Sequence, residues 1–366
     1  MQTMQFNADE DQDGRLLVQA ATLLREGALV AFPTETVYGL GANALDEGAV
    51  ARIFEAKGRP SDNPLIVHIA DHGELESLVA SVPEVARVLM DAFWPGALTL
   101  LFRKSDRVPS IVTAGLDTVG VRMPVHPVAL ELIRKAGVPV AAPSANRSGR
   151  PSPTTAAHVR EDLQGRIPMI VDGGACQVGV ESTVLDVTVD PPMILRPGGV
   201  TREMLEDVIG PVAVDPALTG ESSRPRAPGM KYAHYAPRAP LTLYAGDAAG
   251  ILPRILADAR HWIGKGSKVG ILCTHESMDA YLVGLAPQTD MVAVLPAGRR
   301  GDARSVAAGV FAALRRFDEE RVDVILAEGF DESGVGHAVM NRLRKAAGGH
   351  VVDCGGITAV YGGGSS

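Results

Sequence analysis

The feature that most constrains the fold is the stretch of residues 214–240, which carries five prolines and little hydrophobic periodicity. Proline fixes φ and lacks a backbone N–H, so a helix or a central strand rarely runs through such a stretch. It therefore predicts a linker between a domain of residues 1–213 and a second domain of residues 241–354. A chain of 366 residues is long enough for both domains. Residues 355–366 are rich in glycine and serine and predict a flexible tail.

Before the linker, short apolar segments alternate with helical patterns. Residues 28–32, 65–69 and 138–140 are apolar and have the length of buried strands. Apolar residues recur at helical spacing within 16–24 and 49–54. This alternation predicts an α/β or α+β domain.

After the linker, a second alternation begins. The predicted strands are residues 241–244, 268–273, 291–295 and 322–327, and the predicted helices are residues 251–262 and 305–317. Strands that alternate with helices in this way favour a small parallel sheet covered by its helices.

Composition excludes several classes of protein. The net charge of −8 and the aromatic share of 4% argue against a general nucleic-acid coat protein, although a local basic groove remains open. The three cysteines form no CxxC pair, so neither a zinc knuckle nor a redox pair is predicted, and a reducing compartment is favoured. The N-terminus lacks a secretory apolar region, and no apolar segment is long enough to span a bilayer. We expect a cytoplasmic protein without membrane contact.

The common nucleotide and metal motifs are missing. The sequence has neither GxxxxGK[ST] nor HExxH, and Gly39-Leu40-Gly41 is only a fragment of a dinucleotide fingerprint. Five polar clusters occupy strand ends and loops instead. The first, PTETVYGLG at residues 33–41, places two hydroxyls and a carboxylate after a buried strand; a turn capped by threonine explains it equally well.

The second cluster, KGRPSDNP at residues 57–64, puts two cations on a glycine turn. Arginine binds phosphate oxygens in bidentate fashion, so Lys57 and Arg59 suit a polyphosphate. Complementing a helix C-terminus is an equally good explanation. His68 follows inside an apolar strand, where a lone histidine is more often a core residue.

Three further clusters lie along the chain. Arg122 ends the alternating segment of residues 118–124, a pattern that by itself favours a surface ion pair. Residues 141–149 and Ser152 offer many small hydrogen-bonding groups, with a network of Asx and Ser turns as the alternative. The fifth cluster is GVESTV at residues 179–184, followed by an arginine that ends a strand.

Together these clusters place hydroxyls, amides and cations at the ends of several strands, where α/β folds put binding sites. No nucleophile and base stand out as a pair, and Cys176 has no evident histidine partner. That composition suits a reaction driven by positioning and charge neutralisation, as in phosphoryl or nucleotidyl transfer.

The clusters resemble those of the YrdC-like threonylcarbamoyl-AMP synthases, in the long form with an extra C-terminal domain. The resemblance covers residues 15–205 and extends through the linker into the second domain. It is carried by the segments FPTETVYGLG, KGRPSDNPLIVHI, FWPGALTLLF, VGVRMPVHP, PVAAPSANRSGRPSPT, DGG, GVESTVLDV, ILRPGG and PGMKYAHYAP.

The resemblance implies a twisted, mostly open mixed sheet with helices, joined by the linker to a smaller Rossmann-like parallel α/β domain. It also implies an enzyme, a nucleotidyltransferase, that makes threonylcarbamoyl-AMP and pyrophosphate from L-threonine, bicarbonate or CO₂ and ATP, with Mg²⁺. A separate transferase complex would pass the product to tRNA beside the anticodon. Whether tRNA contacts this chain directly stays open.

The same resemblance implies roles for single residues. Threonine or its carbamate would be held by Thr34, His68, Arg122, Ala142 and Ser182. ATP would be held by Lys57, Arg59, Asn63, Thr118, Ser144, Ser152, Arg196 and Tyr235. Lys57 and Arg59 would act in catalysis, where charge accumulates on the leaving pyrophosphate. Tyr235, with Tyr232 and His234, would reach back from the linker as a lid that excludes water. No protein ligand to a metal is implied.

Two alternatives belong to other classes. The first is a tRNA- or double-stranded-RNA-binding protein without synthase activity, against which the net charge of −8 counts. The second is the carbamoyl-transfer module of hydrogenase maturation, which also has a YrdC-like domain. That module should bring zinc-finger segments, and this chain has no CxxC.

Overall fold

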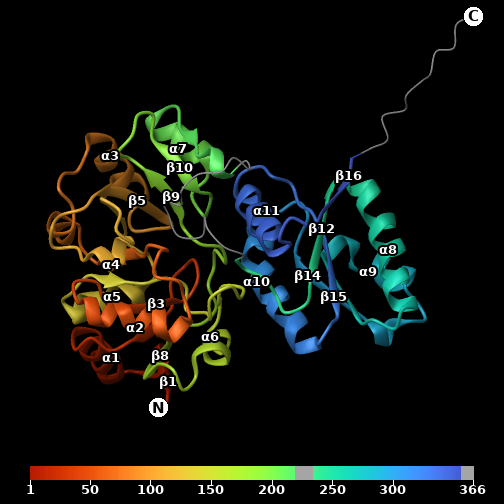
Figure 1. The fold of residues 1–366 in the computed structure, drawn as a ribbon, viewed down its shortest axis with the longest axis horizontal. Helices are drawn as coiled ribbons and strands as arrows, with labels where there is room; N and C mark the ends of the chain where they lie inside the picture. The colour runs from red at the N-terminus through yellow and green to blue at the C-terminus, as the bar shows by residue number, and fades with distance from the viewer. Residues whose placement is uncertain (219–233, 356–366) are drawn as a thin grey trace, which may run out of the picture.

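The computed structural model describes residues 1–218 and 234–355. Two sheets, each with its own helices, lie side by side and are connected through the segment that precedes β12 (Figure 1). Most of the predicted linker, including Tyr232, and residues 356–366 of the predicted tail lie outside the described residues. No helix within the described ranges combines the length and apolar character that a membrane crossing requires.

The first unit carries eleven strands in one sheet. They are β1 (Met4–Asn7), β2 (Val30–Phe32), β3 (Gly39–Asn43), β4 (Ile66–His68), β5 (Leu98–Arg103), β6 (Thr118–Arg122), β7 (Val140–Ala141), β8 (Met169–Asp172), β9 (Thr183–Asp186), β10 (Met193–Arg196) and β11 (Ala213–Val214). Its α-helices are α1 (Arg15–Arg25), α2 (Glu47–Lys57), α3 (Glu84–Phe93), α4 (Ser110–Thr113), α5 (Pro127–Ala136), α6 (Ala156–Leu163) and α7 (Arg202–Ile209). Its 3-10 helices are η1 (Ala8–Glu10), η2 (His72–Ser77) and η3 (Pro216–Leu218).

The first sheet is mixed, in the order β1-β8-β2-β3-β7-β4-β6-β5-β9-β10-β11. In its second half, β6 is antiparallel to β5, β5 is parallel to β9, and β9 is antiparallel to β10. The ends of β6 and β10 therefore lie at the same edge as the beginning of β9. This topology brings Arg122, Ser182 and Arg196 together from positions far apart in the sequence.

Helix α2 shows how capping residues in the local sequence fix the position of a functional side chain. The Asp46 carboxylate accepts from the backbone N–H groups of Gly48 and Ala49 and starts the helix. Gly58 ends it at φ 63°, a left-handed conformation that glycine adopts without strain. These two signals fix the last helical residue, Lys57, at the loop that leads to the site.

The second unit is a five-stranded parallel sheet in the order β14-β13-β15-β12-β16. Its strands are β12 (Leu241–Gly246), β13 (Val269–Thr274), β14 (Val292–Gly298), β15 (Val324–Glu328) and β16 (Val351–Cys354). Its helices are α8 (Ala248–Gly264), α9 (His275–Gly284), α10 (Ala303–Glu320) and α11 (Val335–Ala346), with the 3-10 helix η4 (Thr289–Met291). Figure 1 shows α10 and α11 on the side of this sheet that faces the first unit, and α8 and α9 on the opposite side.

The two units pack closely through α10 and α11. Val37 and Val180 of the first unit belong to the same apolar cluster as Phe311 of α10. At Gly179, a Cβ atom would lie 2.3 Å from the carbonyl oxygen of Ala307, so only glycine permits this approach. The interface is therefore a tightly packed one in which a single methyl group would clash.

Candidate functional site

One cavity collects almost all of the predicted site residues. Its walls include Thr34, Lys57, Arg59, His68, Arg122, Ala142, Ser144, Ser152, Ser182, Arg196 and Tyr235. Further wall residues, for which the sequence predicted no individual role, are Thr36, Asn146, Arg150 and Glu181. The five polar clusters of the sequence thus form one site.

Two predicted residues do not reach this cavity. Among the described residues that line it, neither Asn63 nor Thr118 appears. Asn63 is buried, and its carbonyl oxygen accepts from the guanidinium of Arg59 at 3.3 Å. Thr118 begins β6, whereas Arg122 ends the same strand. Only the end of β6 that carries Arg122 faces the site.

Arg122 is held in a buried ion pair. Its side chain donates to Glu35 Oε1 at 2.5 Å, to Thr36 Oγ1 at 2.9 Å and to the Gly96 carbonyl at 3.0 Å. The side chain of Arg122 is only 5% exposed and that of Glu35 8%. The surface ion pair favoured by the strand pattern alone is therefore wrong. Glu35 was noticed in the sequence only as part of a motif, because nothing local marks its partner.

Arg196 and Ser182 form a second buried set at the same edge of the sheet. The Arg196 guanidinium donates to the Ser182 carbonyl at 2.8 Å and to its hydroxyl at 3.1 Å. The Ser182 hydroxyl also lies 2.8 Å from Thr99 Oγ1 of β5. Burial lowers the pKa of Arg196 to about 10, so the group stays charged at neutral pH.

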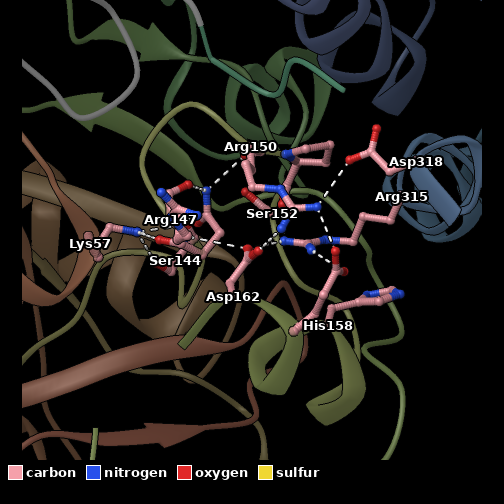
Figure 2. Close-up of polar contacts among 12 residues, drawn as sticks. Lys57, Ser144, Arg147, Arg150, Ser152, His158, Asp162, Arg315 and Asp318 are labelled. Carbon is pink, nitrogen blue, oxygen red and sulfur yellow. Dashed lines mark hydrogen bonds and ion pairs between the residues drawn. The ribbon is translucent and has the colours of Figure 1, made fainter. Parts of the chain in front are cut away.

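Lys57 points from α2 at the loop that follows β7, as Figure 2 shows. Its Nζ donates at 2.5 Å to the carbonyl oxygens of both Ser144 and Asn146. The Ser144 hydroxyl in turn donates to Asn146 Oδ1 at 2.6 Å. Burial places the pKa of Lys57 well below its usual value. Lys57 therefore fixes the loop that forms one wall of the cavity.

Arg59 lies two residues beyond the end of α2, directly after Gly58. Its guanidinium donates to the carbonyl oxygens of Asn63 and Pro64, at 3.3 and 3.1 Å. Burial lowers the pKa of Arg59 to about 10, which leaves it cationic.

His68 is both a core residue and a wall residue. It ends β4, is 4% exposed, and meets the Phe32 ring edge-on at a centroid distance of 6.3 Å. Burial, followed by the nearby charge of Arg122, lowers the pKa of His68 to about 3. Its Nδ1 is buried and has no hydrogen-bond partner among the described residues. A neutral imidazole therefore forms part of the cavity wall.

Glu181 is the only carboxylate on the cavity wall within the part of the chain that the structure describes. It accepts from the Ser152 hydroxyl at 2.5 Å and from Arg342 Nε at 2.9 Å. Arg342 belongs to α11 of the second unit. The sequence included Glu181 only as part of the fifth cluster and predicted no role for it, because its charge partner lies in the other domain.

His234 and Tyr235 close the cavity from the end of the linker. The Tyr235 ring stacks on Phe311 of α10 with centroids 5.2 Å apart, and the backbone N–H of Ala236 donates to the Gly149 carbonyl at 2.9 Å. Tyr235 adopts φ 65°, which is uncommon for a residue with a side chain. Contacts from both units thus hold this aromatic pair over the site.

The cavity is strongly cationic in a chain of net charge −8. Lysine and arginine side chains reach it from α2, β6, β10 and the loop after β7, and they face a single carboxylate. Across the described ranges, no three or more His, Cys, Asp or Glu side chains are grouped so as to hold a metal ion. The arrangement suits a ligand with several negative charges, one of them a planar carboxylate that Arg122 can bind.

Family models match both units. Residues 22–198 match the Sua5, YciO and YrdC model described as "Telomere recombination", and residues 200–348 match the model described as "Threonylcarbamoyl-AMP synthase, C-terminal domain". The chain belongs to the Sua5/YrdC family, in its two-domain form. The family predicted from the sequence motifs is therefore confirmed.

Relatives of similar length support the same family and show the enzyme class. The chain is 55% identical over 337 residues to the threonylcarbamoyl-AMP synthase of Bacillus subtilis, which covers 92% of this chain and 94% of that protein. It is 52% identical over 336 residues to the synthase of Pyrococcus abyssi, with 91% and 94% covered. These matches confirm the predicted enzyme class, a nucleotidyltransferase of the threonylcarbamoyl-AMP synthase type.

Solved structures agree as well. The fold matches the crystal structure of P. abyssi Sua5 complexed with L-threonine with a TM-score of 0.89 and 49% identity, covering 96% of this chain and 99% of that one. The H234A/Y235A variant of P. abyssi Sua5 matches with a TM-score of 0.88 and 47% identity, covering 97% and 99%. The predicted fold class, a mixed-sheet domain joined to a smaller parallel α/β domain, is confirmed.

Proposed function

We propose that this chain makes threonylcarbamoyl-AMP and pyrophosphate from L-threonine, bicarbonate or CO₂, and ATP. The observation that carries this proposal is the single cavity in which Arg122, organised for a carboxylate, faces the cationic groups of Lys57, Arg59 and Arg196. An amino acid and a polyphosphate need these two kinds of site side by side. The relatives named above carry the same activity in their names.

Threonine occupies the part of the cavity around Arg122 in this proposal. The guanidinium binds the substrate carboxylate, since Glu35 and Thr36 already fix its plane. Thr34, His68, Ala142 and Ser182 complete the pocket.

ATP occupies the part around Lys57, Arg59 and Arg196, with Ser144, Ser152 and Tyr235 as further contacts. The cations oppose the charge that builds up on the leaving pyrophosphate. Asn63 and Thr118 lie off the wall, so the proposal assigns ATP contacts to the other residues. The one wall carboxylate, Glu181, is already paired with Arg342, so Mg²⁺ would be held mainly by the phosphates of ATP. When bound, Mg²⁺ would neutralise phosphate charge.

The reaction has two steps in this proposal. The threonine amine attacks CO₂, or bicarbonate with loss of water, and forms a carbamate. A carbamate oxygen then attacks the α-phosphorus in line. The bond from that phosphorus to the oxygen bridging the α- and β-phosphates breaks, and pyrophosphate leaves. No side chain acts as a nucleophile, so the protein works by positioning and charge neutralisation.

Tyr235 and His234 serve as the lid. The product is a mixed anhydride that water would hydrolyse, so excluding water protects it. The product then passes to a separate tRNA-modifying transferase in the cytoplasm, and direct tRNA contact is not required.

Pyrophosphate release from ATP tests the proposal. We expect release only when both threonine and bicarbonate are present. Release that does not depend on threonine would contradict the proposed substrate. A nanomolar, salt-sensitive affinity for tRNA without any pyrophosphate release would favour the RNA-binding alternative instead.

A further inference from the structure

The second domain places one arginine directly behind the wall of the cavity. Arg342 of α11 is completely buried, and its Nε donates to Glu181 Oε2 at 2.9 Å. Its NH1 group donates to the Pro197 carbonyl at 2.6 Å, and its guanidinium carbon lies 5.6 Å from the centre of the Tyr235 ring. Arg342 is not among the described residues that line the cavity. Any effect it has on a ligand therefore passes through Glu181 and Tyr235.

Glu181 needs such a partner because it faces a site for anions. Burial alone would raise its pKa, but the charges of Arg342 and Arg196 and the hydrogen bond from Ser152 outweigh burial and hold the pKa below its usual value. The carboxylate is therefore ionised at neutral pH. An ionised carboxylate without a counter-charge would attract the cations of the cavity and repel a polyphosphate. Paired with Arg342, it leaves the net positive charge of the wall intact.

Tyr235 depends on the same arginine. Its ring has Phe311 of α10 as a stacking partner at 5.2 Å and the Arg342 guanidinium at 5.6 Å. Cation–π contact of this kind is stronger when the cation is desolvated, as Arg342 is. Two helices of the second domain thus hold the closing side chain.

We propose that Arg342 is a positioning residue of the nucleotide site, which neutralises Glu181 and seats Tyr235, so that this site is complete only while the second domain is docked. This inference rests on the proposed function, because it takes ATP as the polyphosphate. It makes the second domain a working part of the site instead of an appended module.

The decisive experiment compares Arg342→Gln with the double variant Glu181→Gln/Arg342→Gln. Removing the arginine alone leaves a buried carboxylate in the anion site, so the KM for ATP rises by about tenfold or more. The KM for threonine stays within about threefold, because Arg122 has its own buried partner. Removing both charges restores the KM for ATP to within about threefold of the unmodified chain, because the unpaired carboxylate is gone and the Tyr235 ring keeps its stacking partner Phe311. A purely structural arginine would show no such rescue.

Arg344→Gln is the matched control. Arg344 lies on the same helix but is 42% exposed and pairs with Glu332, so its removal leaves both KM values unchanged. An unchanged KM for ATP in Arg342→Gln would overturn the inference. So would a double variant that melts at the temperature of the unmodified chain yet keeps the raised KM.

Two further measurements test the inference if Arg342→Gln does not fold or if the chain shows no turnover. If Arg342→Gln does not fold, Glu181→Gln/Arg342→Met takes its place, since methionine keeps an apolar stem without the charge. In this folded double variant, an ATP KM near that of the unmodified chain supports the inference and a tenfold rise overturns it. Calorimetric titration with ATP separates this result from the proposed function, because it reports nucleotide binding without turnover. An unmodified chain that binds ATP but releases no pyrophosphate would refute the proposed reaction alone.

Discussion

At the residue scale, Arg122 shows how the chain prepares a site before a ligand arrives. Three protein groups, from Glu35, Thr36 and Gly96, already receive its hydrogen bonds. A guanidinium fixed in this way loses little side-chain freedom when a carboxylate binds, so more of the interaction appears as affinity. The same pairing keeps a buried charge compensated in the empty protein.

Replacing Arg122 should therefore act on threonine and spare ATP. In Arg122→Ala, loss of a buried charge-assisted contact costs about 2 kcal/mol or more, which raises the KM for threonine by about thirtyfold or more. Steady-state pyrophosphate release at varied threonine measures this. Arg103→Ala is the control, since Arg103 also pairs with an acidic residue, Asp117, but its side chain is 57% exposed. A change confined to the KM for ATP would refute the assignment.

His68 gives the fold a measurable pH dependence. Burial holds its pKa at about 3 in the folded state, whereas in the unfolded chain it is about 6.5. As the pH falls below 6.5, His68 binds a proton in the unfolded state but stays neutral in the folded state. Stability from this group is therefore full above pH 6.5 and is lost as the pH falls toward 3, with a slope approaching about 1.4 kcal/mol per pH unit.

The contribution of His68 to the free energy of unfolding can be isolated by urea denaturation. The unmodified chain and His68→Gln are compared at pH 7.5, 5.5 and 4.5. We expect the unmodified chain to lose stability relative to the variant at each step below pH 6.5. If the difference in unfolding free energy between the two proteins does not change with pH, His68 takes up a proton in the folded state as readily as in the unfolded state, and the prediction is wrong.

Sequence reasoning found most of the site because the residues concerned sit beside strand ends, which local patterns reveal. It failed where a residue is defined by a distant partner. Glu35 and Arg122 are 87 positions apart, and Glu181 and Arg342 are 161 apart. No periodicity or spacing rule connects such pairs, so a buried ion pair looked like a surface one.

At the element scale, the strands and helices that were predicted by residue range are present in the structure, and β1 and β16 are among the strands that were not predicted. Both lie at the edge of their sheets. In β1 only Phe6 is buried, and β16 has no fully buried residue. An edge strand takes its hydrogen bonds from a neighbour and needs no apolar run of its own. The pattern that reveals central strands is therefore missing there.

One glycine, Gly179, permits the close approach of the first unit to α10. In Gly179→Ala, the new Cβ would lie 2.3 Å from the Ala307 carbonyl of α10. The matched control is Gly174→Ala, because Gly174 also has a positive φ, of 81°, but a Cβ there meets nothing within 4 Å. Gly174→Ala should lose only about 1 kcal/mol in its free energy of unfolding, because alanine must adopt a positive φ there. The clash at residue 179 adds about 1–3 kcal/mol more.

Thermal melting and threonine-dependent activity measure both glycine variants. We expect Gly179→Ala to melt at a lower temperature than Gly174→Ala and to lose activity, because α10 must move away from the cavity. Equal melting temperatures for the two variants would mean that the units do not pack as closely as described.

At the scale of the whole molecule, buried charges join the two units. Figure 2 shows Arg315 and Asp318 of α10 directed at Arg150 and Asp162 of the first unit. Arg315 is almost completely buried and donates at 2.6 Å to Asp162 Oδ2 and to the Pro151 carbonyl. Arg150 donates to Asp318 at 3.0 Å. The sequence predicted two domains and a linker but could not predict this docking, since the paired residues belong to different domains.

This docking predicts how the chain unfolds. In Arg315→Ala, Asp162 loses one of its two arginine partners and keeps Arg150, so the lost charge-assisted hydrogen bonds cost about 1–3 kcal/mol at the interface. We expect one calorimetric transition for the unmodified chain and two for the variant, as the domains uncouple. Arg316→Ala, which removes the neighbouring exposed arginine that pairs only within α10, should keep one transition. Two transitions in the unmodified chain would contradict the prediction.

The ion pair between Glu181 and Arg342 also has a consequence for how this family can change over time. Neither residue can be lost alone without stranding a charge in the core, so in two-domain relatives both positions should be replaced together or kept together. A relative without the second domain would lack Arg342, so a charge at the position of Glu181 would have to be balanced from within the first domain.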